Sequence, residues 1–147
     1  MSIDGPFLCD AMCGKLAVYL RMCGYDTAYA LDRGVEADDA VLDLSRAEGR
    51  TLLTRDRDLA ARAEGVLLTE REIEGQLREL HDRGMRLELA EPTRCGACNG
   101  RLQRVDPAAS TPDYAPDSRD EAVWRCCDCG QCFWKGSHWK RVEKTLP

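Results

Sequence analysis

The chain has 147 residues, of which 44% are hydrophobic and 32% are charged. This length suits one ordinary domain, or one small domain with an appendage, and the composition excludes a globally disordered chain. No apolar run reaches the roughly 18–20 residues that a membrane helix needs, and the first residues lack the basic segment of an export signal. We therefore expect a soluble, cytoplasmic protein. Its net charge of −5 argues against binding nucleic acid through bulk charge.

The first ninety residues alternate short apolar runs with helical patterns. An apolar run at 6–9 predicts a strand, and apolar side chains at helical spacing over 13–20 predict the next helix. The same pair recurs as a strand at 27–30 with a helix over 37–44, and as a strand at 51–54 with a short helix through residue 61. A strand at 66–68 precedes a helix over 73–80, for which Thr69 and Glu72 predict a capping box.

Alternating apolar residues at 85–89 then predict a last strand with one face exposed to solvent. Strands and helices that alternate at this pitch are typical of βαβ units and a mostly parallel sheet. Because parallel crossovers are right-handed, we expect helices on both faces of that sheet.

Residues 92–147 differ in character from the rest. They contain a loop rich in Pro, Ala and Asp at about 106–119, and a CxxC pair lies on either side of it. In a cytosolic protein, two such pairs separated by 27 residues indicate a closed, structural Zn²⁺ site. The four predicted ligands are Cys95, Cys98, Cys126 and Cys129. We predict a first domain over 1–91 and a zinc ribbon over 92–147.

Other residues near the second pair offer alternatives. Cys129 and Cys132 also form a CxxC, with Cys127 beside them, but Gly130 directly follows Cys129, as in the usual zinc knuckle. His138 is a substitute ligand in principle, whereas His81 lies on a predicted helix without a partner motif and is expected to face solvent.

The ribbon also interleaves aromatic and basic side chains. These residues are Trp124, Arg125, Phe133, Trp134, Lys135, Trp139, Lys140 and Arg141. Such a mixture can stack on bases and contact phosphates, which makes Trp134 and Lys140 candidate RNA contacts. The alternative is that the tryptophans pack the ribbon against the first domain.

Acidic residues follow the predicted strands. Asp10 ends the first strand, Asp56 and Asp58 follow the third, and Asp38 and Asp39 open the second helix. Ligands of open parallel sheets bind beyond the carboxyl ends of the strands, so these carboxylates are expected to converge. Carboxylate oxygens suit Mg²⁺ or Mn²⁺, which can activate water and stabilise a leaving oxygen. The alternative is that each of them caps a helix or places a favourable charge in its first turn.

Three segments carry a family resemblance: FLCDAMCGKLAVYLRMCGYDT, ADDAVLDLSRAEGRTLLTRDRDLAARA and WRCCDCGQCFWKGSHW. Together with the CxxC pairs, they resemble the Mut-seven C-terminal ribonuclease domain family from about Phe7 to Trp139. The resemblance implies a PIN-like three-layer α/β/α sandwich followed by a zinc ribbon. It also implies a site that depends on Mg²⁺ or Mn²⁺.

The resemblance assigns roles to individual residues. The metal-binding carboxylates are Asp10, Asp39 (with Asp38 as a rival), Asp56 and, with least support, Asp58. Lys15 and Arg55 are the cations that would contact the substrate phosphate, although Lys15 alone would also suit a solvated helix face. Three cysteines depart from the family, which has aliphatic residues there, and are expected in the core. They are Cys9, Cys13 and Cys23.

We therefore predict a metal-dependent endoribonuclease that hydrolyses RNA phosphodiester bonds and leaves a 5′-phosphate on the downstream product. One alternative is a non-catalytic RNA-binding or interaction module that uses the zinc ribbon. A weaker alternative is a toxin-like ribonuclease of a toxin–antitoxin pair. PIN-like domains often dimerise, so a homodimer is among the expected assemblies.

Overall fold

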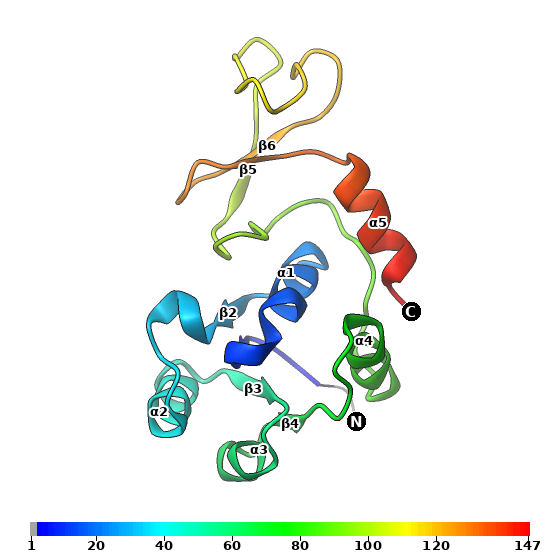
Figure 1. The fold of residues 1–147 in the computed structure, drawn as a ribbon. Helices are drawn as coiled ribbons and strands as arrows, with labels where there is room; N and C mark the ends of the chain where they lie inside the picture. The colour runs from blue at the N-terminus through cyan, green and yellow to red at the C-terminus, as the bar shows by residue number, and fades with distance from the viewer. Residues whose placement is uncertain (1–2) are drawn as a thin grey trace.

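A four-stranded parallel sheet organises the first part of the chain. The computed structural model describes residues 3–147, shown in Figure 1. The strands are β1 (Phe7–Cys9), β2 (Thr27–Tyr29), β3 (Thr51–Thr54) and β4 (Val66–Leu67), in the order β2-β1-β3-β4. All three neighbouring pairs are parallel. The predicted βαβ organisation is confirmed, and β1 and β3 lie side by side as the convergence of the carboxylates requires.

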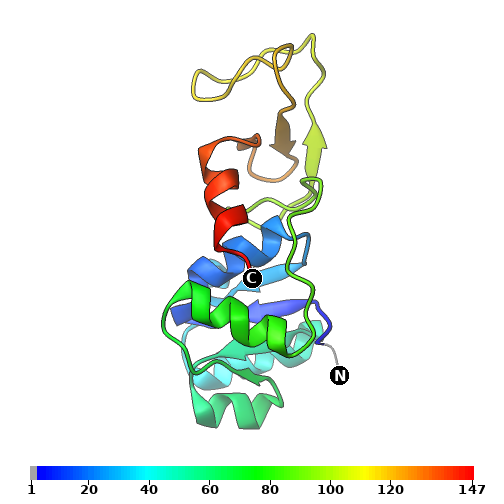
Figure 2. The same ribbon diagram turned by 90° about the vertical axis from the view of Figure 1, so that its right-hand side faces the viewer.

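Helices cover both faces of the sheet (Figures 1 and 2). The short 3-10 helix η1 (Ala11–Cys13) leads into α1 (Gly14–Met22), and η2 (Ala30–Arg33) precedes α2 (Asp38–Glu48). They are followed by α3 (Arg57–Ala63) and α4 (Ile73–Asp82). In the part of the chain that is described, no helix combines the length and the apolar character needed to cross a membrane.

The strand residues alternate between two hydrophobic cores. Phe7 and Cys9 of β1 pack with α1 and α4, whereas Leu8 packs with α2 and α3 on the opposite face. In β3, Leu53 belongs to the first core and Leu52 to the second. This period of two places one apolar layer on each side of the sheet, which explains why the predicted strands are continuous apolar runs.

The C-terminal part is a small antiparallel sheet followed by a helix. Strands β5 (Leu102–Arg104), β6 (Trp124–Cys126) and β7 (Cys132–Phe133) are adjacent in that order. Helix α5 (Ser137–Thr145) turns back toward the first part of the molecule (Figure 2). Its Val142 is fully buried in the core that α1 and α4 share. The division of the chain at residues 91 and 92 stays a prediction.

Two local predictions are wrong. Residues 85–89 form no strand, although Met85 and Leu87 are buried as the alternation implies. They pack against the core shared by α1 and α4 instead of pairing with an edge of the sheet.

The capping box is also absent: Glu72 makes no capping hydrogen bond, and the Glu79 carboxylate accepts hydrogen bonds from the backbone N–H groups of Thr69 and Glu70. A carboxylate from the second turn of α4 thus takes the place that Glu72 was predicted to fill.

A polar junction holds the first CxxC segment against the sheet. Buried Arg21 of α1 donates to the carbonyl oxygens of Thr27 (2.8 Å) and Gly96 (2.9 Å). The Asn99 side chain accepts from Thr27 N–H (3.0 Å) and donates to the Asp26 carboxylate (2.7 Å). Residues more than 70 positions apart in sequence are joined here by groups that are largely removed from water.

Replacing Arg21 should therefore be costly. Arg21→Ala leaves two buried carbonyl groups without donors, and we expect a loss of about 3 kcal/mol in the free energy of unfolding. Urea titration of the zinc-loaded protein measures it. The matched control is Arg86→Ala, because the Arg86 side chain is 81% exposed and, among the described residues, pairs only with Glu88; a change within about 0.5 kcal/mol is expected. Equal losses in both variants would contradict the importance of the junction.

Candidate active site and metal centre

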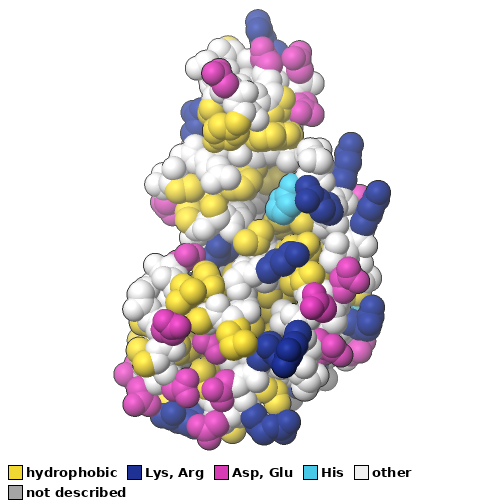
Figure 3. Space-filling model, in the orientation of Figure 1, with side chains coloured by type: hydrophobic (Ala, Val, Ile, Leu, Met, Phe, Trp, Pro, Cys, Tyr) yellow, Lys and Arg dark blue, Asp and Glu magenta, His cyan; other side chains and the backbone are white. Residues whose placement is uncertain are grey.

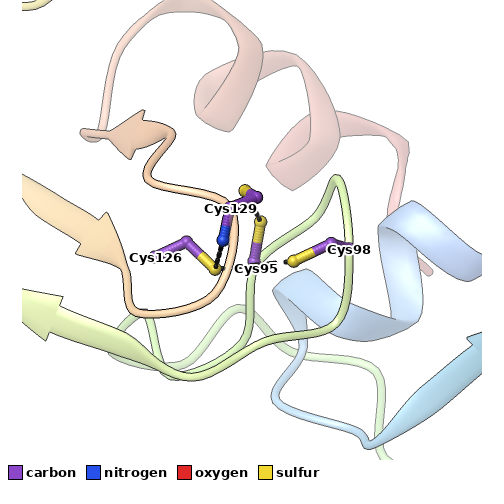
Figure 4. A group of neighbouring side chains, drawn as sticks. All are labelled: Cys95, Cys98, Cys126 and Cys129. Carbon is purple, nitrogen blue, oxygen red and sulfur yellow. Dashed lines mark hydrogen bonds between the residues drawn. The ribbon is translucent and has the colours of Figure 1, made fainter.

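The four predicted zinc ligands come together at one point (Figure 4). Their sulfur atoms all lie within 4.8 Å of one another. Cys95 Sγ is 3.7 Å from Cys129 Sγ, and Cys98 Sγ is 3.5 Å from Cys126 Sγ. Tetrahedral Zn²⁺ with Zn–S bonds near 2.3 Å would separate its sulfurs by about 3.8 Å. The cluster is thus close enough, and has the right donors, to hold one zinc ion.

The backbone around each pair makes this approach possible. The residue after the second cysteine of each pair has a left-handed conformation: Asn99 with φ 73° and Gly130 with φ 79°. Asn, like Gly, tolerates this region of backbone space better than most residues. Gly100 serves a different purpose, since a Cβ atom there would lie 2.8 Å from Cys126 Sγ. The first turn therefore depends on Asn99 for its shape and on Gly100 for space, a division of roles that the sequence analysis missed.

The remaining cysteines and histidines stay outside this cluster. Cys132 is buried in the ribbon core with Val105 and Val123, and Cys127 is exposed, so the alternative pairing through Cys132 is wrong. Neither His138 nor His81 joins the cluster, and both are exposed.

The three cysteines of the first part have the predicted surroundings. Cys9 and Cys13 are buried in the core, and Cys23 packs against it. Burial and the Asp10 charge raise the pKa of the Cys13 thiol to about 11, and burial with the Glu88 charge raises that of Cys23 to about 12. These thiols are protonated at neutral pH, which fits core residues without thiol chemistry.

Asp10 and Asp56 lie at the carboxyl ends of the adjacent strands β1 and β3, linked by one hydroxyl group. The Oγ1 atom of Thr54 donates to Asp10 Oδ2 (2.7 Å) and accepts from the backbone N–H of Asp56 (3.0 Å). Thr54 itself is fully buried. The sequence analysis missed this residue, although its place as the last strand residue before Arg55-Asp56 was a usable signal.

Both carboxylates also act as helix caps. Asp10 Oδ1 accepts from Ala11 N–H (2.8 Å) at the start of η1, and Asp56 Oδ1 accepts from Leu59 N–H (3.0 Å) at the start of α3. The capping interpretation is therefore confirmed for these two residues. Asp56 Oδ2 makes no hydrogen bond within the described chain, so capping leaves one of its oxygens available as a ligand.

The other acidic candidates lie at the start of α2 and α3. Asp38 and Asp39 are in the first turn of α2, whose N-cap is Ala37, so neither of them caps it. Asp39 is 85% exposed and pairs with Arg62 of α3 at 2.7 Å. Asp58 is exposed in the first turn of α3. Because α2 and α3 both run back from the carboxyl edge of the parallel sheet, all three acidic residues belong to that side of the molecule.

The carboxylates do not form a close cluster. Within residues 3–147, the four cysteines are the sole set of three or more candidate ligands close enough to share an ion. Mg²⁺ needs only one or two protein carboxylates, with water and substrate phosphate completing its shell. The donor chemistry of Asp10 and Asp56 fits that requirement, while the participation of Asp39 and Asp58 stays a prediction.

The predicted cationic contacts lie near this edge. Lys15 is exposed in the first turn of α1, directly after η1. Arg55 precedes Asp56, and its buried Nε has no hydrogen-bond partner among the described residues. Its charge opposes the rise in the pKa of Cys13, which places it near the residue that ends η1. Arg55 therefore lies near the end of η1, and Lys15 lies in the helix that follows it.

The aromatic residues of the ribbon have divided roles. Trp124 is buried, with Arg104 and Lys135 over its ring at 5.4 and 5.9 Å, so it packs within the ribbon. Trp134 is half-buried against the ribbon core and lies 6.2 Å from the Tyr114 ring. Lys140 is exposed on α5. On the face seen in Figure 3, hydrophobic side chains, a histidine and several Lys or Arg side chains gather between the two parts of the molecule.

The family model described as the Mut7-C RNAse domain matches residues 6–146. The chain belongs to the Mut7-C RNAse domain family. No curated protein and no solved structure matches it closely enough to count. Membership of the Mut7-C family indicates a ribonuclease-like function with RNA as the substrate class. The match covers both the parallel sheet and the four-cysteine ribbon, so the ribbon is part of the family unit.

Adjacent cysteines offer a matched test of the metal centre. Cys126→Ser replaces one of the four clustered thiols and should abolish stoichiometric zinc binding, because a site with three thiolates and a hydroxyl binds zinc far less tightly. Cys127→Ser changes the exposed neighbour and should retain wild-type zinc. Elemental analysis of the purified proteins measures both. Zinc loss from Cys127→Ser, or full retention by Cys126→Ser, would contradict the ligand assignment.

Proposed function

We propose that this protein is a PIN-like endoribonuclease that uses Mg²⁺ or Mn²⁺ to hydrolyse RNA phosphodiester bonds. The observation that carries the proposal is the pair Asp10 and Asp56 on neighbouring parallel strands, held to the same Thr54 hydroxyl. Membership of a ribonuclease domain family supports it. In open parallel sheets this edge is where ligands bind.

Asp10 and Asp56 would hold the divalent ion, with Asp39 or Asp38 and then Asp58 as further ligands. When bound there, the ion supplies an activated water and stabilises charge on the leaving oxygen. Asp39 would have to exchange its contact with Arg62 for the ion. Because its carboxylate is 85% exposed and the ion pair is at the surface, that exchange costs little.

The neighbouring cations would place the substrate. Lys15, in the first turn of α1, and Arg55, directly before Asp56, would bind the phosphate that is cut, offsetting the charge that develops during the reaction. Among residues 3–147, the buried Arg55 Nε has no partner, so this residue has an unsatisfied donor. Cleavage without participation of the 2′-hydroxyl group would leave a 5′-phosphate on the downstream product.

The zinc ion would be structural. Four cysteines fill a tetrahedral shell and leave no open position for a substrate. Zinc held by Cys95, Cys98, Cys126 and Cys129 would instead fold the ribbon and keep its first turn against Arg21.

A second candidate is an RNA-binding module without catalysis. It is favoured by the capping bonds of Asp10 and Asp56, which give both carboxylates a structural role, and by the exposed cations of α5. The two candidates make different predictions for variants of the acidic edge.

Cleavage of a labelled RNA mixture separates them. With Mn²⁺ or Mg²⁺ added to the zinc-loaded protein, Asp10→Asn and Asp56→Asn should each slow cleavage on the order of 100-fold or more. Omission of the divalent ion should have the same effect and leaves the zinc in place. The matched control is Asp82→Asn, at the far end of α4 and 74% exposed, which should cleave like the wild type. RNA binding without any cleavage by the well-folded wild type would instead support the binding module.

Thr54 should act as a positioning residue. Thr54→Val keeps the shape but removes the hydroxyl that links Asp10 and Asp56, and we expect a loss of roughly tenfold or more in kcat. Thr54→Ser retains the hydroxyl and should keep most of the activity. If Thr54 only filled space in the core, Thr54→Ser would be the more damaging substitution, because serine leaves a small cavity that valine fills. Thermal unfolding of both variants measures their stability for that comparison.

A further inference from the structure

A groove separates the first part of the molecule from the ribbon, and no role has been assigned to it so far. Its volume is about 380 Å³, within the range of small-molecule sites. Its walls include Val18 and Met22 of α1, Gly96 and Ala97 of the first CxxC turn, and Trp134 and Trp139 of the ribbon. We call it the junction groove. From it we infer that the protein binds an unpaired RNA base between α1 and the two tryptophans.

The aromatic side of the junction groove is built to present flat surfaces. Trp134 and Trp139 are both only half-buried, so part of each ring stays accessible. A Cβ atom at Gly136 would lie 2.6 Å from Trp134 Nε1, so the chain folds tightly against this ring and fixes its orientation. Lys135 lies over the Trp139 ring at 5.3 Å. Aromatic rings that keep part of their surface accessible can stack on a base, and the Lys135 charge can contact the phosphate beside it.

The opposite wall is held in place by the polar junction. Gly96, whose carbonyl accepts from Arg21, lies close to Val18, since a Cβ atom there would be 3.4 Å from Val18 Cγ1. The groove is therefore shaped before any ligand binds.

Positive charge at the rim suits the phosphates beside such a base. His138 lines the groove, and the partial desolvation of its imidazole there, together with the charges of Arg141 and Lys15, lowers its pKa. Its imidazole is therefore neutral at pH 7 and can hydrogen-bond a base edge. Neither Lys15 nor Arg141 has a salt-bridge partner among residues 3–147, whereas Lys135 is paired with Glu91. An acidic chain thus keeps two cations near His138 that have no salt-bridge partner among residues 3–147.

The junction groove also continues the proposed active site. Lys15, which follows Asp10 by five residues in the first turn of α1, is near enough to His138 for its charge to lower the pKa of that histidine. Val18 and Met22 follow Gly14 on the same helix by about 6 and 12 Å at the usual helical rise. This inference rests on the proposed function: an RNA strand cut beside Asp10 would place a neighbouring unpaired base in the junction groove.

Nucleotide titration tests the base directly in the zinc-loaded wild type. In ¹H–¹⁵N spectra, AMP should shift the indole N–H signals of Trp134 and Trp139, while the signal of buried Trp124 should move little. Ribose 5-phosphate has the same phosphate and sugar without the base and should leave the signals of Trp134 and Trp139 in place. Equal shifts with both ligands would mean that the groove binds phosphate alone and would overturn the inference.

RNA binding by variants gives an independent measurement. In an Asp10→Asn background, which prevents cleavage under the proposed function, fluorescence anisotropy of a labelled single-stranded oligonucleotide reports affinity. Trp139→Ala should weaken binding about tenfold. Ala97→Phe fills the groove from an exposed position without removing any packing and should do the same. Ala108→Phe, in the remote ribbon loop, is the matched control for added bulk and should bind normally.

The outcomes separate this inference from the proposed function. If Ala97→Phe binds RNA as tightly as the wild type, the inference about the junction groove is overturned, even if Asp10→Asn abolishes cleavage. Weakened binding by Ala97→Phe supports the groove even if the wild type cleaves no RNA, in which case the proposed ribonuclease fails alone. An RNA duplex that binds as tightly as the single strand would also overturn the inference, because paired bases cannot enter the groove.

Discussion

The contact between Arg21 and the first CxxC turn is the constraint on which the rest of the structure depends. A buried arginine and the side chain of Asn99 join the end of α1 and the start of β2 to residues more than 70 positions away. Such buried polar contacts are costly unless all partners are present, so they favour one arrangement over its alternatives. Zinc would fold the ribbon, and this contact decides where the ribbon lies. The junction groove exists because the two are held side by side.

The acidic edge shows how one set of residues can serve both folding and chemistry. In this parallel sheet, Asp10 and Asp56 come within two residues of the end of a strand and begin the next helix. Asp10 and Asp56 therefore satisfy free backbone N–H groups at the starts of η1 and α3, and they face the same edge of the sheet for the same reason. A cap uses one carboxylate oxygen, so structural and proposed catalytic roles are compatible at Asp56. The buried Thr54 hydroxyl hydrogen-bonds to both residues and thereby restricts their positions.

Local patterns predicted most of the architecture. The apolar runs of β1 to β4 and the helical spacing of α1 and α2 result from burial on the two faces of a sheet. This burial requires apolar residues at a fixed spacing within each segment, so the pattern is visible in the sequence. The CxxC pairs predicted the metal centre because two sulfurs two residues apart can reach one ion in a tight turn. The errors arose where a distant partner decided the outcome. Glu79 replaced Glu72 at the start of α4, and residues 85–89 packed on a helical layer instead of pairing as a strand.

The sequence by itself determined the α/β class, the family and the four clustered cysteines, because each depends on residue spacing within short segments or on the order of motifs along the chain. Only the tertiary structure decided that Thr54, 44 residues from Asp10, links it to Asp56, that Asp39 is paired with Arg62, and that the ribbon faces α1 across a groove. These features depend on which strands become neighbours and on which buried donors find acceptors. Strand neighbours and hydrogen-bond partners are selected because they minimise the free energy of the whole chain, so they cannot be predicted from any one segment.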